Sequence, residues 1–283
     1  METDHRIIAD KVPLTLAHLT VQEVPPADAI TIAAETGFQY ATMRLHSPRL
    51  GAKNLSTREL NDEVQKALLV SRKSGVLVSS IEALVLAPET DILTYTPILE
   101  AAAKLSARCV LVVAFDNVYS RMLDNFGALS ASASQLGLGL EIEFMVFSEI
   151  KDLQKAMQVL ADAGSPNDKI VIDVLHLLRS GGSPQDILRV PPAMISQIQL
   201  SDGPKYAGPE CLVEEARFDR MFIGEGEFPL TEILSKRPPA VPLALEIPAE
   251  RLRLQGISAQ ERALRARRSF ESLVSTRLLP RAR

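Results

Sequence analysis

The amino-acid sequence predicts an α/β protein that folds as a single-domain (β/α)8 TIM barrel. Short strand-like runs alternate with longer helical patterns, and each strand and helix together take about 30 residues or slightly more. Eight strand-like runs alternate with helical patterns in this way, and no linker-like stretch divides the chain. Although 283 residues would also suffice for two average domains, α/β barrels commonly reach about 250 residues as one unit. We therefore expect one barrel domain over residues 1–283.

The eight predicted strands are rich in β-branched and aliphatic residues. Several are apolar at consecutive positions, such as the run Cys-Val-Leu-Val-Val-Ala-Phe, which is typical of strands that helices cover. An open doubly wound sheet is the alternative, but no Gly-x-Gly-x-x-Gly motif follows any of the strands. The strands are expected at residues 14–19, 40–45, 76–83, 109–115, 138–144, 170–173, 195–200 and 243–247.

The helical patterns between the strands end at recognisable positions. Gly37, Gly75 and Gly164 each follow the last turn of a predicted helix, where glycine is the usual C-terminal cap. Residues 201–229 form the longest stretch without clear periodicity, and a connection of that length favours a loop over a functional site. The helices are expected at residues 27–36, 57–74, 95–105, 119–135, 149–163 and, for the last helix, about 259–279.

Composition and charge exclude several classes of protein. The chain has 46% apolar and 23% charged residues, as globular domains do, and its net charge of −4 argues against a nucleic-acid partner and favours a small-molecule partner. The sequence shows no signal peptide and no run approaching the roughly 18 apolar residues of a membrane span, so we expect a cytoplasmic protein without a membrane partner. Cys109 and Cys211 are too few for a disulfide framework and are expected to be buried thiols.

Polar and ionisable residues collect at the ends of four consecutive predicted strands. Glu143 ends the fifth of these strands, Asp173 ends the sixth, and Gln199 and Glu246 lie near the ends of the seventh and eighth. In a TIM barrel the active site lies at the carboxyl ends of the strands. A charge in an apolar strand is costly unless it is paired or bound to a metal, and oxygen ligands suit Mn²⁺ or Mg²⁺. The four residues therefore predict a shared divalent metal ion.

Salt bridges are the alternative explanation for this cluster. Arg44, Arg217 or Arg220 would then neutralise the carboxylates in place of a metal. Glu141 has the same strand parity as Glu143, so it is expected to point inward one layer deeper, either as a competing ligand or as part of an internal pair. We favour Glu143 as the ligand because it is nearer the open end of the barrel.

Four further residues lie near the ends of the first three predicted strands. Arg44 and His46 end the second strand, Glu82 lies in the third, and His18 lies in the first. Each of them either faces a substrate or is a satisfied residue of the core or rim. Arg44 and Glu82 are retained as candidate substrate-binding residues.

Five short motifs in order resemble those of the sugar phosphate isomerase/epimerase family, the xylose isomerase-like TIM barrels. They are Leu-Glu-Ile-Glu-Phe-Met, Ile-Asp-Val-Leu-His-Leu-Leu-Arg-Ser-Gly-Gly, Ile-Gln-Leu-Ser-Asp, Arg-x-x-Arg-x-x-x-Gly-Glu-Gly-Glu-Phe-Pro-Leu and Leu-Glu-Ile. The early segments Leu-Ala-His-Leu-Thr and Ala-Ala-Glu-Thr-Gly-Phe are also similar to the family, so the resemblance covers nearly the whole chain.

The resemblance implies a divalent metal ion, Mn²⁺, Mg²⁺ or Co²⁺, and a substrate-binding pair at His176 and Arg220, with Arg217 as a second candidate. Many ketose epimerases of the family have histidine where this chain has Gln199, which replaces an imidazole nitrogen by an amide oxygen. The implied metal ligands are Glu143, Asp173, Gln199 and Glu246.

Such a ligand set predicts an isomerase or epimerase that acts on a keto-sugar or polyol-like substrate through an enediolate. Glu143 and Glu246 would act as general base and general acid on opposite faces of the reacting carbon. The same enediolate could instead expel a β-hydroxyl group, so the second hypothesis is a dehydratase of the inosose or 3-dehydroshikimate type. The third hypothesis is a non-catalytic binding protein on the same barrel, because fold does not fix function. Family members are often oligomers, so a homo-oligomer is also expected.

Overall fold

The computed structural model of the chain describes residues 12–47 and 54–277, which form a closed barrel of eight parallel strands. Each strand pairs with the next in the sequence, and the eighth pairs with the first. This arrangement confirms the predicted TIM barrel. The strands are β1 (Leu14–Leu16), β2 (Tyr40–Arg44), β3 (Leu77–Leu86), β4 (Cys109–Ala114), β5 (Gly139–Glu143), β6 (Lys169–Asp173), β7 (Ile195–Leu200) and β8 (Leu243–Leu245).

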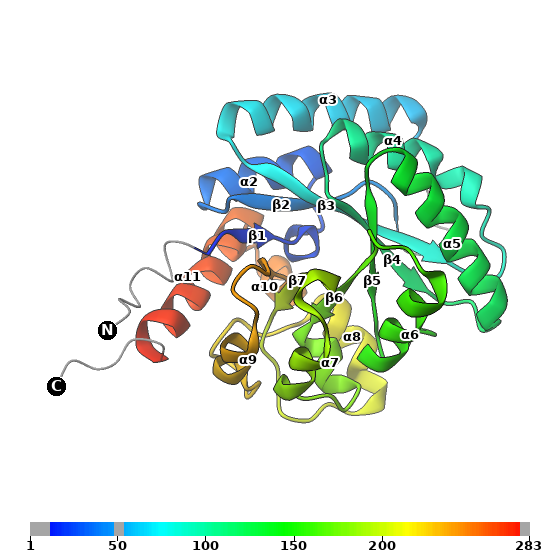
Figure 1. Cartoon of the computed structure of the whole chain (residues 1–283). Coiled ribbons are helices and arrows are strands. Elements are labelled where there is room, and N and C mark those ends of the chain that lie inside the picture. The colour runs from blue at the N-terminus through cyan, green and yellow to red at the C-terminus, as the bar shows by residue number, and fades with distance from the viewer. Residues whose placement is uncertain (1–11, 48–53, 278–283) are drawn as a thin grey trace, which may run out of the picture.

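Helices surround the barrel, and the last helix packs beside the first elements of the chain (Figure 1). Short 3-10 helices lie at His18–Val21, Ile92–Tyr95, Pro184–Arg189, Pro192–Met194 and Pro209–Cys211. None of the described helices is long and apolar enough to cross a membrane. The α-helices are α2 (Pro26–Glu35), α3 (Thr57–Ser74), α4 (Thr96–Lys104), α5 (Tyr119–Gln135), α6 (Leu153–Ala163), α7 (Val174–Arg179), α8 (Leu212–Phe218), α9 (Leu230–Lys236), α10 (Glu250–Leu254) and α11 (Ala259–Arg277).

Capping residues in the sequence set the ends of the longer helices. Ser56 and Glu59 form a reciprocal capping box at the start of α3, which satisfies two otherwise unpaired backbone N–H groups. Gly75 and Gly164 end α3 and α6 with φ angles of 77° and 69°, a left-handed conformation that glycine adopts without steric cost. Both glycines therefore confirm the predicted helix ends.

Asp152 caps α6, and its replacement by alanine is expected to lower the free energy of unfolding by about 1 kcal/mol. The Asp152 carboxylate accepts a hydrogen bond from the Lys155 N–H at 2.7 Å, which alanine cannot replace. Urea denaturation followed by circular dichroism measures the loss. Lys151→Ala, an exposed neighbour outside the helix, serves as the control; an equal loss in both variants would contradict the capping role.

Several predicted boundaries were wrong. Helix α6 begins at Leu153 rather than at residue 149, because Asp152 supplies the cap. Helices α7, α8, α9 and α10 were not predicted, since five to seven residues are too few to show a helical period. The end of the last helix near residue 279 lies outside the described residues. Cys109 is buried as expected, but Cys211 is exposed because it lies in a surface 3-10 turn.

Two apolar clusters stabilise the barrel. The larger one fills the space between the helices and the outer faces of the strands. The smaller one lies on β3 to β6 and on residues just after these strands, and it includes Leu111, Val113, Met145 and Val171. Three of these side chains, Leu111, Val113 and Met145, line the cavity at the carboxyl ends of the strands. One side of that cavity is therefore apolar.

Candidate active site

A cavity of about 530 Å³ opens at the carboxyl ends of the barrel strands. Glu143 and Glu246 from the ends of β5 and β8 line it, together with His176 from α7 and Arg220 from the connection after α8. Asp173 ends β6 beside them and is completely buried. The end of the barrel that the sequence predicted for the site is therefore the end where these side chains meet.

Asp173 connects strand β6 to helix α7. One carboxylate oxygen, Oδ1, accepts hydrogen bonds from the backbone N–H groups of Leu175 and His176 at 2.7 and 3.3 Å, so Asp173 is the N-cap of α7. The other oxygen, Oδ2, accepts from Arg220 Nη1 at 2.6 Å. The cap places His176 in the first turn of the helix, beside the end of β6.

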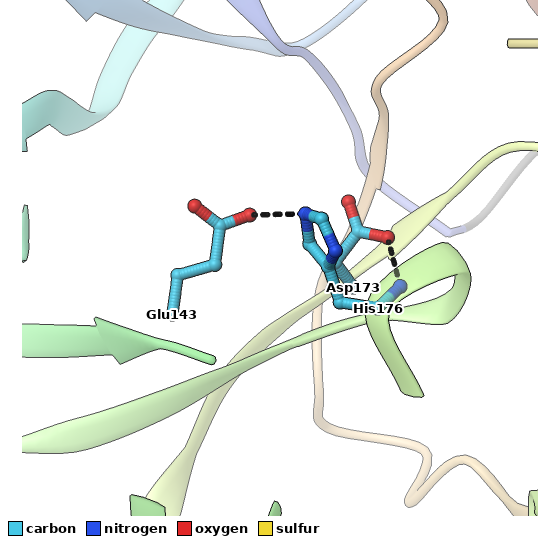
Figure 2. Close-up of side chains that lie close together, drawn as sticks. All are labelled: Glu143, Asp173 and His176. Atoms are coloured by element: carbon cyan, nitrogen blue, oxygen red, sulfur yellow. Dashed lines mark hydrogen bonds and ion pairs between the residues drawn. The ribbon is translucent and has the colours of Figure 1, made fainter. Parts of the chain in front are cut away.

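Glu143, Asp173 and His176 converge at the centre of the site (Figure 2). Each offers a ligand atom, and these atoms lie within 4.8 Å of one another. His176 Nε2 is 3.9 Å from Glu143 Oε1. Burial lowers the pKa of His176 to about 4, so its imidazole is neutral at pH 7, the form that binds metals. Its Nδ1 atom is buried without a hydrogen-bond partner among the described residues.

Arg220 lies between Asp173 and Glu246 and contacts both carboxyl groups. Its Nη2 atom is 3.0 Å from Glu246 Oε2, while its Nη1 atom contacts Asp173. Gln199 Nε2 donates a hydrogen bond to the second oxygen of Glu246 at 3.2 Å. The Arg220 side chain is itself fixed by donation from Nε to the Ala216 carbonyl oxygen at 3.0 Å.

The buried carboxyl groups differ in their affinity for protons. Burial raises the pKa of Glu143 well above its usual range, and the nearby charge of Asp173 adds to the rise. Burial also raises the pKa of Glu246, although Arg220 opposes the effect. For Asp173, burial opposes ionisation, but the charge of Arg220 and its hydrogen bond to the carboxylate bring the pKa below its usual value. The site therefore combines one stable carboxylate with two carboxyl groups that hold protons unusually tightly.

Salt bridges explain part of the cluster, because Arg220 pairs with Asp173 and Glu246 and Arg44 lies 3.5 Å from Glu82. They do not explain all of it. Gln199 Oε1 is buried with no hydrogen-bond partner among the described residues, although such an acceptor normally costs about 1–3 kcal/mol. An oxygen-preferring divalent cation would satisfy this atom and favour loss of the Glu143 proton. The donor set therefore fits a divalent metal ion.

The connection after β7 forms one wall of the cavity and contains structure that the sequence did not predict. Asp202 organises it, since Oδ1 accepts from the N–H groups of Gly203 and Phe228 and Oδ2 from that of Gly224. Helix α8 and the isolated bridge between Asp202 and Met221 also lie within it. This connection carries Arg217 and Arg220 to the cavity.

The four polar residues near the ends of the first three strands have different surroundings, and His18 lies in the 3-10 helix after β1 rather than in the strand. His18 is structural, because its Nε2 bonds to the Val24 carbonyl oxygen at 3.1 Å and its Nδ1 accepts from the Arg44 N–H at 2.9 Å. Glu82 lines the cavity and is only 1% exposed, yet neither of its oxygens has a hydrogen-bond partner among the described residues. Arg44 Nε is likewise buried without a hydrogen-bond partner among the described residues. This side of the cavity therefore has polar atoms that the described structure leaves without hydrogen bonds.

Two features of the cavity were missed by sequence reasoning. Asn54 lines it and contacts His46 Nε2 at 3.0 Å, but it lies outside every periodic segment. Leu111, Val113 and Met145 form its apolar side. The alternation of residues along β4 could have identified Leu111 and Val113, because inward and outward positions alternate in a strand.

Comparison with known proteins places the chain in a class and then in a family. A closed parallel barrel with carboxylates at the carboxyl ends of its strands defines a TIM-barrel protein with a site at that end. The chain belongs to the xylose isomerase-like TIM barrel family, whose model matches residues 30–273. This confirms the resemblance found in the sequence motifs. No curated protein matches the sequence.

Solved structures share the fold at low sequence identity. An IolI protein with a bound zinc atom has a TM-score of 0.74 and 15% identity, covering 93% of this chain and 98% of its own. A D-psicose 3-epimerase crystallised with D-fructose has a TM-score of 0.67 and 16% identity, covering 92% and 98%. The probable 3-DHS dehydratase AsbF from Bacillus anthracis has a TM-score of 0.69 and 15% identity, covering 93% and 99%.

A fusion of a xylose isomerase-like TIM barrel with a 4-hydroxyphenylpyruvate dioxygenase is also similar, with a TM-score of 0.73 and 18% identity over 95% of this chain. The chain spans only 43% of that protein's length. At these identities the similarities establish the fold and not the reaction.

Proposed function

We propose that the protein is a divalent-metal-dependent isomerase or epimerase of a keto-sugar or polyol-like substrate. The observation that carries the proposal is the convergence of Glu143, Asp173, Glu246 and the unpartnered Gln199 Oε1 at the carboxyl ends of β5 to β8. The similarity to an epimerase and to a zinc-binding barrel supports it.

The residues that would hold the metal ion are Glu143, Asp173, Gln199 and Glu246, and the proposed ions are Mn²⁺, Mg²⁺ or Co²⁺. His176 approaches the same centre and is proposed to bind a substrate oxygen, as are Arg220 and Arg217. A bound divalent ion would polarise the substrate carbonyl and stabilise the negative charge that develops on its oxygen.

Glu143 and Glu246 are proposed to move the proton. They reach the cavity from β5 and β8, so a substrate carbon between them would expose one face to each carboxyl group. One takes the proton as general base and the other returns a proton as general acid. Return to the opposite face of the same carbon gives the epimer, and return to the neighbouring carbon gives the isomer. His176, neutral and buried, would donate a hydrogen bond to the developing oxyanion.

The test is metal-dependent exchange of substrate hydrogen for solvent deuterium, followed by NMR. Metal-stripped protein is incubated in D₂O with ketoses, inososes and 3-dehydroshikimate, before and after addition of Mn²⁺, Mg²⁺ or Co²⁺. Exchange that requires the metal, with an epimer or isomer as product, is the expected result. Absence of both metal binding and exchange would favour a non-catalytic binding protein, whereas metal binding without exchange would indicate a substrate outside this set.

Gln199→Met is expected to weaken Mn²⁺ binding at least about tenfold, because methionine has a similar volume but supplies no amide oxygen. Isothermal titration calorimetry measures the dissociation constant. Gln135→Met, at an exposed position in α5, is the matched control and should bind Mn²⁺ as the wild type does. Unchanged binding in both variants would exclude Gln199 as a ligand.

Glu82→Gln is expected to raise the KM of the substrate about tenfold with a smaller change in kcat. Glu82 Oε2 lies 3.5 Å from Arg44, but neither oxygen of Glu82 has a hydrogen-bond partner among the described residues, and hydroxyl groups of a polyol would supply such donors. Glutamine keeps the shape but replaces one acceptor by a donor. Steady-state kinetics with the substrate found in the exchange experiment measures both constants, and a pure loss of kcat would contradict a binding role.

Dehydration is the second candidate reaction. Gln199 in β7 favours it over ketose epimerisation, because many ketose epimerases of the family have histidine at that position, and the fold is similar to that of the probable 3-DHS dehydratase AsbF. The same carboxyl groups would then abstract a proton and protonate a departing hydroxyl. The exchange experiment separates the reactions, since loss of water from 3-dehydroshikimate or an inosose would replace the epimer as product.

The proposed partner is therefore a small carbohydrate-like molecule, and the proposed compartment is the cytoplasm. Both cysteines are free thiols, which fits a reducing compartment.

A further inference from the structure

A second cavity opens at the opposite end of the barrel from the candidate active site. It has a volume of about 440 Å³, and Cys109 and Lys169, the first residues of β4 and β6, line it. Two positions further along these strands are Leu111 and Val171, which are buried apolar side chains of the barrel interior. These side chains lie between the two cavities, so the second cavity is a separate compartment.

The floor of the second cavity is polar, which is unusual inside a TIM barrel. Inward side chains of such barrels form layers of four from alternate strands, and branched apolar residues dominate them. Here β1, β3, β5 and β7 supply Thr15, Ser80, Glu141 and Gln197, each at most 4% exposed. Ser80 Oγ donates to Glu141 Oε1, and Gln197 Nε2 donates to the same oxygen at 3.4 Å. The proposed reaction uses none of these four residues.

Three cationic side chains belong to the lining of this cavity. Arg108, Lys169 and Arg237 line it, and none of them lies within ion-pair distance of a carboxylate among the described residues. Arg237 Nη1 donates to the carbonyl oxygens of Pro238, Pro239 and Val241 at 3.3, 3.0 and 2.5 Å, whereas its Nε is buried without a partner. The charge of Arg237 therefore lacks a counter-ion within the described structure.

The balance of charge around the cavity is positive. Among the described residues that line it, Arg108, Lys169 and Arg237 are accompanied by a single carboxylate, that of Glu141. An anion would restore the balance, and oxyanions match the geometry of the arginine N–H groups.

We propose that the second cavity binds a small organic oxyanion, a phosphate or a carboxylate, separately from the active site. The anionic group is held between Arg108, Lys169 and Arg237. The remainder of the ligand extends toward the hydroxyl and amide groups of Ser80 and Gln197, which recognise hydroxyl substituents. The volume of the cavity suits a small metabolite.

The test is calorimetric titration of the metal-stripped, full-length protein with inorganic phosphate and, in a second arm, with malonate. Sodium chloride holds the ionic strength constant, because general charge screening would otherwise contribute. Saturable binding of at least one probe is expected in the wild type. Arg237→Gln and Lys169→Gln are each expected to raise the dissociation constant at least about tenfold. The arm with the tighter binding distinguishes a phosphate from a carboxylate ligand.

Two controls locate the binding. Arg72→Gln removes an exposed arginine in the last turn of α3 and should leave the dissociation constant within about twofold. Arg44→Gln removes a cation of the active-site cavity and should do the same. Binding that is lost in Arg44→Gln but kept in Arg237→Gln would assign the anion to the active site and overturn the proposal, as would no saturable binding. If Arg237→Gln does not fold, Arg108→Gln, at an exposed position, replaces it.

Discussion

Glu143→Gln and Glu246→Gln are each expected to reduce metal-dependent formation of the epimer or isomer by about a thousandfold or more. Removal of a positioned acid or base typically costs 10²- to 10⁴-fold, and each tenfold corresponds to about 1.4 kcal/mol of activation free energy. The structure places both carboxyl groups in the same buried cavity with pKa values raised by burial, as expected for groups that exchange protons near neutral pH.

Loss of a ligand and loss of a proton carrier must be distinguished in these variants. Glutamine keeps one oxygen atom that can bind a metal ion, so product formation is measured at metal concentrations that saturate each variant, with occupancy determined separately. Glu100→Gln, an exposed glutamate of α4, is the matched control and should form product at the wild-type rate. A variant that binds metal fully and keeps product formation within tenfold would exclude its carboxyl group as acid or base.

The barrel could be predicted because strand and helix patterns alternate strongly along the whole chain. Strand parity also predicted that Glu141 and Glu143 both point inward, at different depths, and the structure places them in different cavities. Local periodicity carries this information, since the side chains of a strand alternate between its two faces. The short helices α7 to α10 could not be predicted, because their lengths follow from packing against the barrel.

The pairing within the candidate site could not be predicted from the sequence. Arg220 was one of three arginines considered, and its place between Asp173 and Glu246 depends on a connection without periodicity. Asp202 holds that connection in place by accepting backbone hydrogen bonds from residues up to 26 positions away. Contacts of this kind arise only when distant segments fold together.

Arg220→Met is expected to lower the free energy of unfolding of the metal-free protein by about 3–5 kcal/mol. Arg220 is 3% exposed and contacts two buried carboxylates, so removal of its charge leaves Asp173 and Glu246 without compensation. Methionine fills a similar volume, which separates the loss of charge from the loss of packing. Urea denaturation in the presence of a chelator measures the effect, and Arg251→Met, at an exposed position of α10, is expected to change it by less than about 0.5 kcal/mol.

The pH dependence of this loss identifies its cause. In the wild type, Arg220 lowers the pKa of Asp173 in the folded protein, so Asp173 contributes stability above its unfolded pKa and loses it as the pH falls through the lower folded pKa. Without Arg220, burial raises the folded pKa of both carboxyl groups, and the variant becomes less stable as the pH rises toward neutrality. The deficit of Arg220→Met should therefore be larger at pH 7 than at pH 5. Mn²⁺ should restore part of it, because a cation bound among the same carboxylates replaces the lost positive charge. A deficit independent of both pH and Mn²⁺ would show that Arg220 contributes through packing alone.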